Sequence, residues 1–404
     1  MASSYPLITV KRNDTVVWGE FLIAIGLFLI WPLASVLFSL RFFKRVPGMI
    51  IFVAFWVFVM LNMRIRIGID IYWYVRGLSL PVGTILGGER TGGFWNQYYM
   101  LSVMLAFKYH VDKFIIYVIW GIFWGFGLYL CLRILLKYQS NTAIFKMFVI
   151  LSLFYVPPYM FSGLRFFTGC FYLVAVFHYI QTSKSKQSLW LLFIPPFFHQ
   201  MILVITLVYL MYYLWNPGRK WMIIMIVVSF ALSFVDYRPL IDGIDFFGGN
   251  EHYMGDERNN DIHNRMNLGW LIPIPLQLSL WFMVAVMFYN WKDLDEKAKT
   301  LLKLASFSII FFNLTTASYD FHYRFKAIMF WMCTFPVVYY YKQTRTRLYN
   351  FFKFAFPICL IVGNWETFVT AGPNIFNVKD IFFNNVSGVI DDFKHMLYHQ
   401  PKPR

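Results

Sequence analysis

Long and nearly uncharged apolar runs recur along this chain, and they constrain its fold more than any other feature. Hydrophobic residues make up 59% of the 404 positions, and charged residues make up only 14%. A helix that crosses a bilayer core needs about 20 consecutive apolar residues. Continuous runs of this kind exclude a transmembrane β-barrel, whose strands alternate between apolar and polar residues. The pattern therefore predicts an all-α polytopic membrane protein.

The apolar runs also predict how the chain is divided. Two shorter segments, 94–110 and 189–199, are too polar or are broken by a Pro-Pro pair, and we expect re-entrant or interfacial helices there. We expect residues 1–370 to form one integral membrane domain and residues 371–404 to form an outer tail. The predicted transmembrane helices, about 11 in number, cover residues 17–40, 47–63, 114–136, 146–161, 166–181, 201–215, 222–235, 267–290, 301–318, 325–341 and 354–370.

The formal net charge of +16 is concentrated in short basic loops between the apolar runs. Lysine and arginine in short loops favour the cytoplasmic side of a membrane. This placement leaves two longer loops, about 64–93 and 236–266, on the outer side. Lysines on the cytoplasmic side suit contact with anionic lipid. The positive charge is therefore interpreted as a membrane-anchoring signal, and no nucleic acid partner is expected.

Arg165 interrupts two long apolar stretches in the run Ser162-Gly-Leu-Arg165. A guanidinium group keeps its charge at any accessible pH. Placing it in or beside the membrane core costs from about 2.5 to over 10 kcal/mol. Arg165 either extends toward the interface, as long basic side chains do, or binds a pyrophosphate group and neutralises leaving-group charge. We expect the second role.

The first outer loop begins with an alternation of apolar and polar residues. It places Arg64 and Arg66 shortly before Asp70, with Tyr74 close behind. The two arginines would contact an anionic ligand, and Asp70 would act as a general base that deprotonates an attacking hydroxyl group. The alternative is an Arg–Asp ion pair above an aromatic belt at the interface.

Two later positions carry further polar groups. His199 follows the Pro-Pro pair and would orient a phosphate or relay a proton; alternatively, it bonds a backbone carbonyl that the prolines leave free. The run from Tyr319 to Arg324 includes His322 and Tyr323 and would form the far wall of a cavity. In the alternative, Asp320 and Arg324 pair one helical turn apart.

Several motifs are absent from the sequence. It contains no Walker-type phosphate loop, no His/Cys spacing typical of zinc sites and no Gly-x-Ser-x-Gly elbow. We therefore expect no cofactor and no metal, so that arginines would have to neutralise any phosphate charge.

The order of several short motifs resembles a known family. These motifs are Gly68-Ile-Asp-Ile-Tyr72, Gly163-Leu-Arg165, a Lys/Ser loop at 183–186, Phe197-Phe-His199 and Tyr323-Arg-Phe325. Their order is similar to that of the EpsG-like branch of the Wzy-type O-antigen and exopolysaccharide polymerases. The family usually has a serine soon after the histidine, whereas Gln200 and Met201 follow it here.

The resemblance implies a glycosyltransferase of the bacterial inner membrane with a GT-C-like architecture. Such an enzyme transfers a growing glycan from undecaprenyl pyrophosphate onto the next lipid-linked repeat unit at the periplasmic face. Its partners would be these lipid-linked glycans, membrane lipids and a chain-length regulator protein. The implied roles are catalysis by Asp70, Glu89 and His199, pyrophosphate binding by Arg165, Arg64, Arg66 and Arg324, and glycan binding by Tyr74, Trp95, His322 and Tyr323.

Three other functions compete with the polymerase. An O-antigen ligase would use the same site chemistry with a lipid A acceptor. A membrane acyltransferase would need a histidine with an arginine on the cytoplasmic side, where only His178 is expected. A polysaccharide flippase or transporter would show related halves and paired broken helices.

Overall fold

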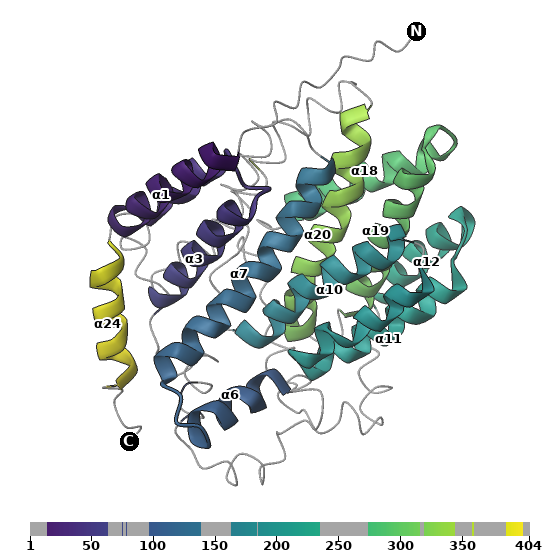
Figure 1. The fold of residues 1–404 in the computed structure, drawn as a ribbon. Helices are drawn as coiled ribbons and strands as arrows, with labels where there is room; N and C mark the ends of the chain where they lie inside the picture. Colours follow the sequence, from purple (N-terminus) through teal and green to yellow (C-terminus); the bar gives the residue numbers. More distant parts are fainter. Residues whose placement is uncertain are drawn as a thin grey trace.

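The computed structural model describes residues 14–63, 75, 78, 97–138, 163–183, 185–234, 274–315, 319–343, 358 and 385–398. Within these ranges every regular element is a helix, which confirms the all-α prediction (Figure 1). Apart from isolated positions, the predicted spans 146–161 and 354–370 and the outer loops 64–93 and 236–266 lie outside the described residues.

Helices α3 (Val46–Leu61) and α7 (Lys113–Tyr138) form a close antiparallel pair. The Tyr117 hydroxyl, near the start of α7, donates to the carbonyl of Met60 near the end of α3, over 3.1 Å. Small residues permit the close approach: a Cβ atom at Gly125 would lie 3.1 Å from the Cβ of Trp56. Glycines spaced four apart, as in Gly121 and Gly125, are typical of tightly packed membrane helices.

The first predicted span, 17–40, is not one continuous helix. Helix α1 ends at Ile30, and α2 (Pro32–Ser39) begins after Trp31. Pro32 lacks the backbone N–H that a continuing helix would use and its ring would clash with the preceding turn. The chain folds back, since the Ser35 hydroxyl donates to the carbonyl of Ala24 over 2.6 Å. The prediction of a single crossing over 17–40 was therefore wrong.

A second hairpin follows α7 in the described chain. Ser183 and Ser188 are hydrogen bonded through their side chains at one end of the hairpin, and the rings of Tyr172 and Phe198 stack 4.8 Å apart toward the other. The segment predicted as re-entrant is therefore a 3₁₀ run that lies antiparallel along α10. The helices α10, η2, η3 and α11 cover Leu164–Ser183, Lys186–Phe193, Pro195–Phe197 and Gln200–Trp215.

The remaining helices complete one bundle. Helix α20 (Tyr319–Gln343) packs antiparallel to α19 (Glu296–Leu314) and also contacts α10 and α7. Helix α6 (Gln97–Phe107) lies across the end of the bundle near the start of α7 (Figure 1). The other described helices are α1 (Asp14–Ile30), α12 (Arg219–Leu232), α18 (Ile274–Tyr289), η4 (Trp291–Asp293) and α24 (Val386–Tyr398).

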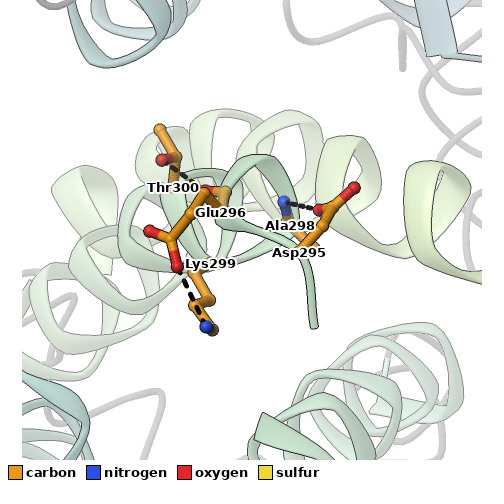
Figure 2. Close-up of polar contacts among 5 residues, drawn as sticks. All are labelled: Asp295, Glu296, Ala298, Lys299 and Thr300. Atoms are coloured by element: carbon orange, nitrogen blue, oxygen red, sulfur yellow. Dashed lines mark hydrogen bonds and ion pairs between the residues drawn. The ribbon is translucent and has the colours of Figure 1, made fainter. Parts of the chain in front are cut away.

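Basic side chains gather at one end of the bundle, which we call the basic end. The ammonium group of Lys297 lies 5.0 Å from the ring centres of both Tyr138 and Tyr339, so α7, α19 and α20 meet there. Helix α19 begins at this end, where Asp295 accepts from the amide of Ala298 over 2.7 Å (Figure 2). The described cations of the basic end are Arg41, Lys44, Arg45, Lys137, Arg219, Lys220, Lys292, Lys297, Lys299 and Lys303.

Helix α24 belongs to the predicted outer tail and is amphipathic. Its buried face consists of Val389, Phe393 and Leu397, one turn apart. The Phe393 ring lies 4.5 Å from the ring of Tyr117, near the start of α7. The tail is thereby fixed beside the end of α7 that lies away from the basic end.

One described helix, α7, is long and apolar enough to cross a membrane on length and composition alone. Shorter apolar helices are Val17–Ile30, Val46–Leu61, Gln97–Phe107, Met201–Trp215 and Leu280–Tyr289. Length and composition alone are weak evidence, because buried core helices of soluble proteins meet the same criterion.

Candidate anion-binding site

Arg165 lies at the end of the bundle opposite the basic end. It is the second residue of α10. Its half-buried guanidinium carbon lies 4.9 Å from the centre of the Tyr99 ring on α6. A guanidinium group over an aromatic face gains a cation–π attraction of about 0.5–2 kcal/mol. The ring therefore holds one face of the guanidinium and fixes its plane.

The 3₁₀ run carries His199 to the same end. Pro195 and Pro196 lack backbone donors, so an α-helix cannot continue through them, and α11 starts afresh at Gln200. His199 is the N-cap of α11 and is buried, with an exposed fraction of 7%. Its ring lies edge-on to the ring of Phe166, with centroids 5.4 Å apart.

Arg324 reaches this place from α20. Its guanidinium carbon lies 5.7 Å from the centre of the same Phe166 ring. Phe166 is thus shared by His199 and Arg324, and it follows Arg165 directly in the sequence. The structure therefore brings Arg165, His199 and Arg324 together from α10, the α11 N-cap and α20.

The hydrogen bonds of His199 determine its tautomer. The backbone N–H of Met201 donates to His199 Nδ1 over 3.2 Å. Burial lowers the pKa of His199 well below 6.5, and the charges of Arg165 and Arg324 lower this pKa further. The imidazole is therefore neutral near pH 7. Because Nδ1 accepts a hydrogen bond, the proton is on Nε2, which can only donate.

The three side chains share one chemical property. Two guanidinium groups and a neutral Nε2–H all donate hydrogen bonds, and none of these groups accepts one at neutral pH. Donor groups that converge on one place suit a ligand with several acceptor oxygens and negative charge. Among the described residues no cluster of three or more His, Cys, Asp or Glu could hold a metal ion. The arrangement suits an anion such as phosphate or pyrophosphate.

The other predicted site residues are distributed differently. His322 lies on the side of α20 that faces α19, where its ring centre is 4.0 Å from that of Phe312. It is therefore apart from the cluster around Phe166, and its glycan-binding role stays a prediction. Tyr323 lies on α20, but its side chain is outside the described residues. The predicted residues Arg64, Arg66, Asp70, Tyr74, Glu89 and Trp95 also lie outside the described residues.

Sequence reasoning missed the aromatic rings that support the two guanidinium groups. No role was expected for Phe166, although it directly follows Arg165, or for Tyr99. Neither residue belongs to a recognisable sequence motif, and Tyr99 is 66 positions from Arg165 in the sequence. Only the folded structure brings the Tyr99 ring and the Arg165 guanidinium together.

Comparison with known proteins adds no assignment. No family model, no curated protein and no solved structure matches this chain.

Proposed function

We propose that this chain is a polytopic membrane glycosyltransferase that polymerises isoprenoid-pyrophosphate-linked repeat units. The proposed enzyme lies in the bacterial inner membrane with its active site on the periplasmic face, and its architecture is GT-C-like. It transfers the growing glycan from one lipid carrier onto the repeat unit of another.

Exposed apolar side chains support the membrane location. A soluble protein rarely exposes a contiguous apolar patch larger than a few hundred Å². Here large apolar side chains are exposed along α1, α11, α12 and α18. Examples are Leu22, Ile23, Leu29, Met211, Leu214, Trp221, Val227, Phe230, Leu278 and Phe282. Lipid tails are the surroundings in which these surfaces are stable.

Helix lengths and charge support the polytopic arrangement. At 1.5 Å per residue, the 20 residues of α10 and the 25 residues of α20 extend about 30 and 38 Å, enough to cross a hydrocarbon core. The basic end lies at one end of these helices and the cluster around Arg165 at the other. Positive charge favours the cytoplasmic side, and the cluster then faces the periplasm.

The donor-only cluster of Arg165, His199 and Arg324 is the observation that carries the proposal. In glycosyl transfer, the acceptor hydroxyl oxygen bonds to the anomeric carbon, and the bond from this carbon to the pyrophosphate oxygen breaks. The departing pyrophosphate takes the electron pair, and the hydroxyl proton passes to a base. Fixed donors at the departing oxygens stabilise the charge that develops there.

The catalytic base of the reaction is assigned from the sequence analysis. Asp70 or Glu89 would accept the proton from the hydroxyl group, because a carboxylate near that group is a suitable base. His199 cannot be this base in its neutral state, since Nδ1 accepts from Met201 and Nε2 already carries a proton. We assign it to the pyrophosphate, in place of the catalytic role that the resemblance implied.

Purified lipid-linked repeat units and the reconstituted protein provide the test. The wild type should yield a ladder of chain lengths, whereas Arg165→Ala should yield only single repeats. Loss of one charge-assisted hydrogen-bond donor should lower the transfer rate by at least about tenfold. Arg133→Ala removes an exposed arginine from α7 and serves as the matched control.

The same assay distinguishes the alternatives. A normal ladder from Arg165→Ala would remove this residue from the site and contradict the proposal. Transfer to lipid A without any ladder from the wild type would identify a ligase instead. Movement of lipid-linked units across the bilayer without transfer would identify a flippase.

A further inference from the structure

Helix α6 supports the donor-only cluster without supplying a donor to it. The helix lies across the end of the bundle (Figure 1), and its Tyr99 ring centre lies 4.9 Å from the guanidinium carbon of Arg165. The ring of Tyr98 lies 4.9 Å from that of Phe198, which directly precedes His199. The placement of α6 therefore affects the surroundings of Arg165 and of His199.

Trp120 of α7 contacts α6 through a hydrogen bond. Its Nε1–H donates to the hydroxyl oxygen of Ser102 over 2.8 Å, and this hydroxyl group donates to the carbonyl of Tyr98 over 2.8 Å. Trp120 and Ser102 are both buried, with exposed fractions of 1% and 5%. Because a buried donor that loses its acceptor destabilises the structure, the Nε1–H favours the one placement of α6 that satisfies it.

This hydrogen bond sets the register of α6, because the residues next to Ser102 cannot replace it. A shift by one residue would turn α6 by about 100° and move it about 1.5 Å along its axis. The Trp120 Nε1–H would then meet a side chain without a hydroxyl or amide group. The neighbours of Ser102 in α6 are Met100, Leu101, Val103 and Met104.

The register of α6 determines where the Tyr99 ring lies. Tyr99 precedes Ser102 by three residues, so the two side chains are neighbours on one side of the helix. The Tyr99 ring centre lies 6.5 Å from that of Trp120. A turn of α6 by about 100° would carry the Tyr99 ring away from the Arg165 guanidinium. Trp120 therefore influences Arg165 through Ser102 and Tyr99.

Ring contacts attach α6 to the bundle independently of this hydrogen bond. The Tyr98 ring lies 5.7 Å from that of Phe123 on α7, edge-on, in addition to its contact with Phe198. Aromatic pairs tolerate a range of distances and angles, whereas a hydrogen bond weakens steeply as it bends. Loss of the hydrogen bond should therefore leave α6 attached but less precisely placed.

We propose that Trp120 is a positioning residue for the pyrophosphate site: its hydrogen bond to Ser102 sets the register of α6 and holds the Tyr99 ring over Arg165. The inference rests on the proposed function, because the group that Arg165 binds is taken to be the pyrophosphate of the lipid carrier. A guanidinium group held in one plane loses less conformational freedom when it binds such a group.

Farnesyl pyrophosphate carries the same isoprenoid-linked pyrophosphate and serves as the probe. The full-length protein is reconstituted in phosphatidylcholine nanodiscs, and binding is measured by calorimetric titration. Trp120→Phe removes the Nε1–H and keeps a ring, and Ser102→Ala removes the acceptor. Each variant should weaken the affinity about two- to fivefold, the size of one cation–π contact. Wild-type affinity in both variants would overturn the proposal.

A double-mutant cycle separates positioning from a general loss of stability. Tyr99→Leu removes the ring through which Trp120 is proposed to act. Adding Trp120→Phe to Tyr99→Leu should therefore weaken binding no further, since the two changes remove one and the same contact. A full additional loss in the Tyr99→Leu background would show that Trp120 acts by another route and would overturn the proposal.

Two control variants alter buried groups elsewhere. Trp124→Phe changes a tryptophan one turn further along α7, whose ring packs on Trp56 and Phe171. Ser39→Ala changes a buried serine of α2 that donates to the carbonyl of Val36 in its own helix. Both controls should keep the wild-type affinity. An equal loss in the controls would show that binding follows overall stability, and the positioning role would fall.

The failures are separable. If Arg165→Ala loses binding while Trp120→Phe and Ser102→Ala keep it, the positioning role is overturned and the proposed function stands. No binding by a folded wild type overturns both. If Trp120→Phe does not fold, Ser102→Ala decides alone, and unchanged affinity in that variant overturns the positioning role.

Discussion

At the residue scale, the cluster depends on the neutral state of His199. A protonated His199 between two arginines would add a third positive charge to a buried place, and burial and both arginines oppose this by lowering its pKa below 6.5. The unfolded chain has an ordinary histidine that gains a proton as the pH falls below about 6.5. The folded protein therefore loses stability relative to the unfolded chain as the pH falls through that value.

This sign gives a testable pH dependence. The melting temperature of the wild type in detergent should fall between pH 7.5 and pH 5.5, by the equivalent of at most about 1.4 kcal/mol per pH unit. His199→Gln removes the titrating group and offers an amide N–H in place of Nε2–H, so its melting temperature should change less over this range. Parallel curves for the two proteins would contradict a depressed pKa at His199.

Tyr99 gives a second residue-scale prediction. The guanidinium carbon of Arg165 lies 4.9 Å from the centre of its ring. Tyr99→Phe should keep the affinity for farnesyl pyrophosphate, whereas Tyr99→Leu should weaken it about two- to fivefold by removing the cation–π contact. Calorimetric titration of both variants checks this. Equal loss in the two would assign the effect to the hydroxyl group instead.

At the scale of elements, much of the helical pattern follows from the sequence. The expected segments 47–63 and 201–215 agree closely with α3 and α11, because each is a long apolar run that the sequence leaves uninterrupted. The sequence analysis missed the hairpin at Trp31. Pro32 removes one backbone N–H donor, and this loss does not change the hydropathy of the run. The meeting of Arg165 with His199 could not be predicted either, because it depends on the path of the 3₁₀ run along α10.

That path depends on Gly169 in α10. A Cβ atom there would lie 2.1 Å from Cδ1 of Ile202 and 3.2 Å from the carbonyl oxygen of Pro195. Ile202 can rotate away from a small side chain, but the backbone carbonyl cannot. Gly169→Leu should therefore push the 3₁₀ run off α10 and displace His199, with a loss of about 1–3 kcal/mol in stability.

The matched control for Gly169→Leu is Gly26→Leu in α1, where no described residue outside the local helix backbone lies within 4 Å of an added Cβ. Thermal unfolding and farnesyl pyrophosphate binding should both decline for Gly169→Leu and stay near wild type for Gly26→Leu. Unchanged binding by Gly169→Leu would show that the position of His199 does not depend on this contact.

At the scale of the whole molecule, the bundle has two chemically different ends. The basic end contains most of the described lysines and arginines, whereas the other end contains the donor cluster, helix α6 and the start of α7. The orientation of the whole chain follows from this asymmetry if positive charge stays in the cytoplasm.

Labelling from outside intact cells tests this orientation with two matched lysines. Lys108 is exposed in the turn after α6, and Lys292 is exposed in η4 at the basic end. The described cysteines, Cys131, Cys170 and Cys333, are buried, so they should add little background. A membrane-impermeant maleimide should label Lys108→Cys in intact cells, and it should label Lys292→Cys only after the membrane is opened. The reverse pattern would place the donor cluster on the cytoplasmic side and contradict the proposed periplasmic active site.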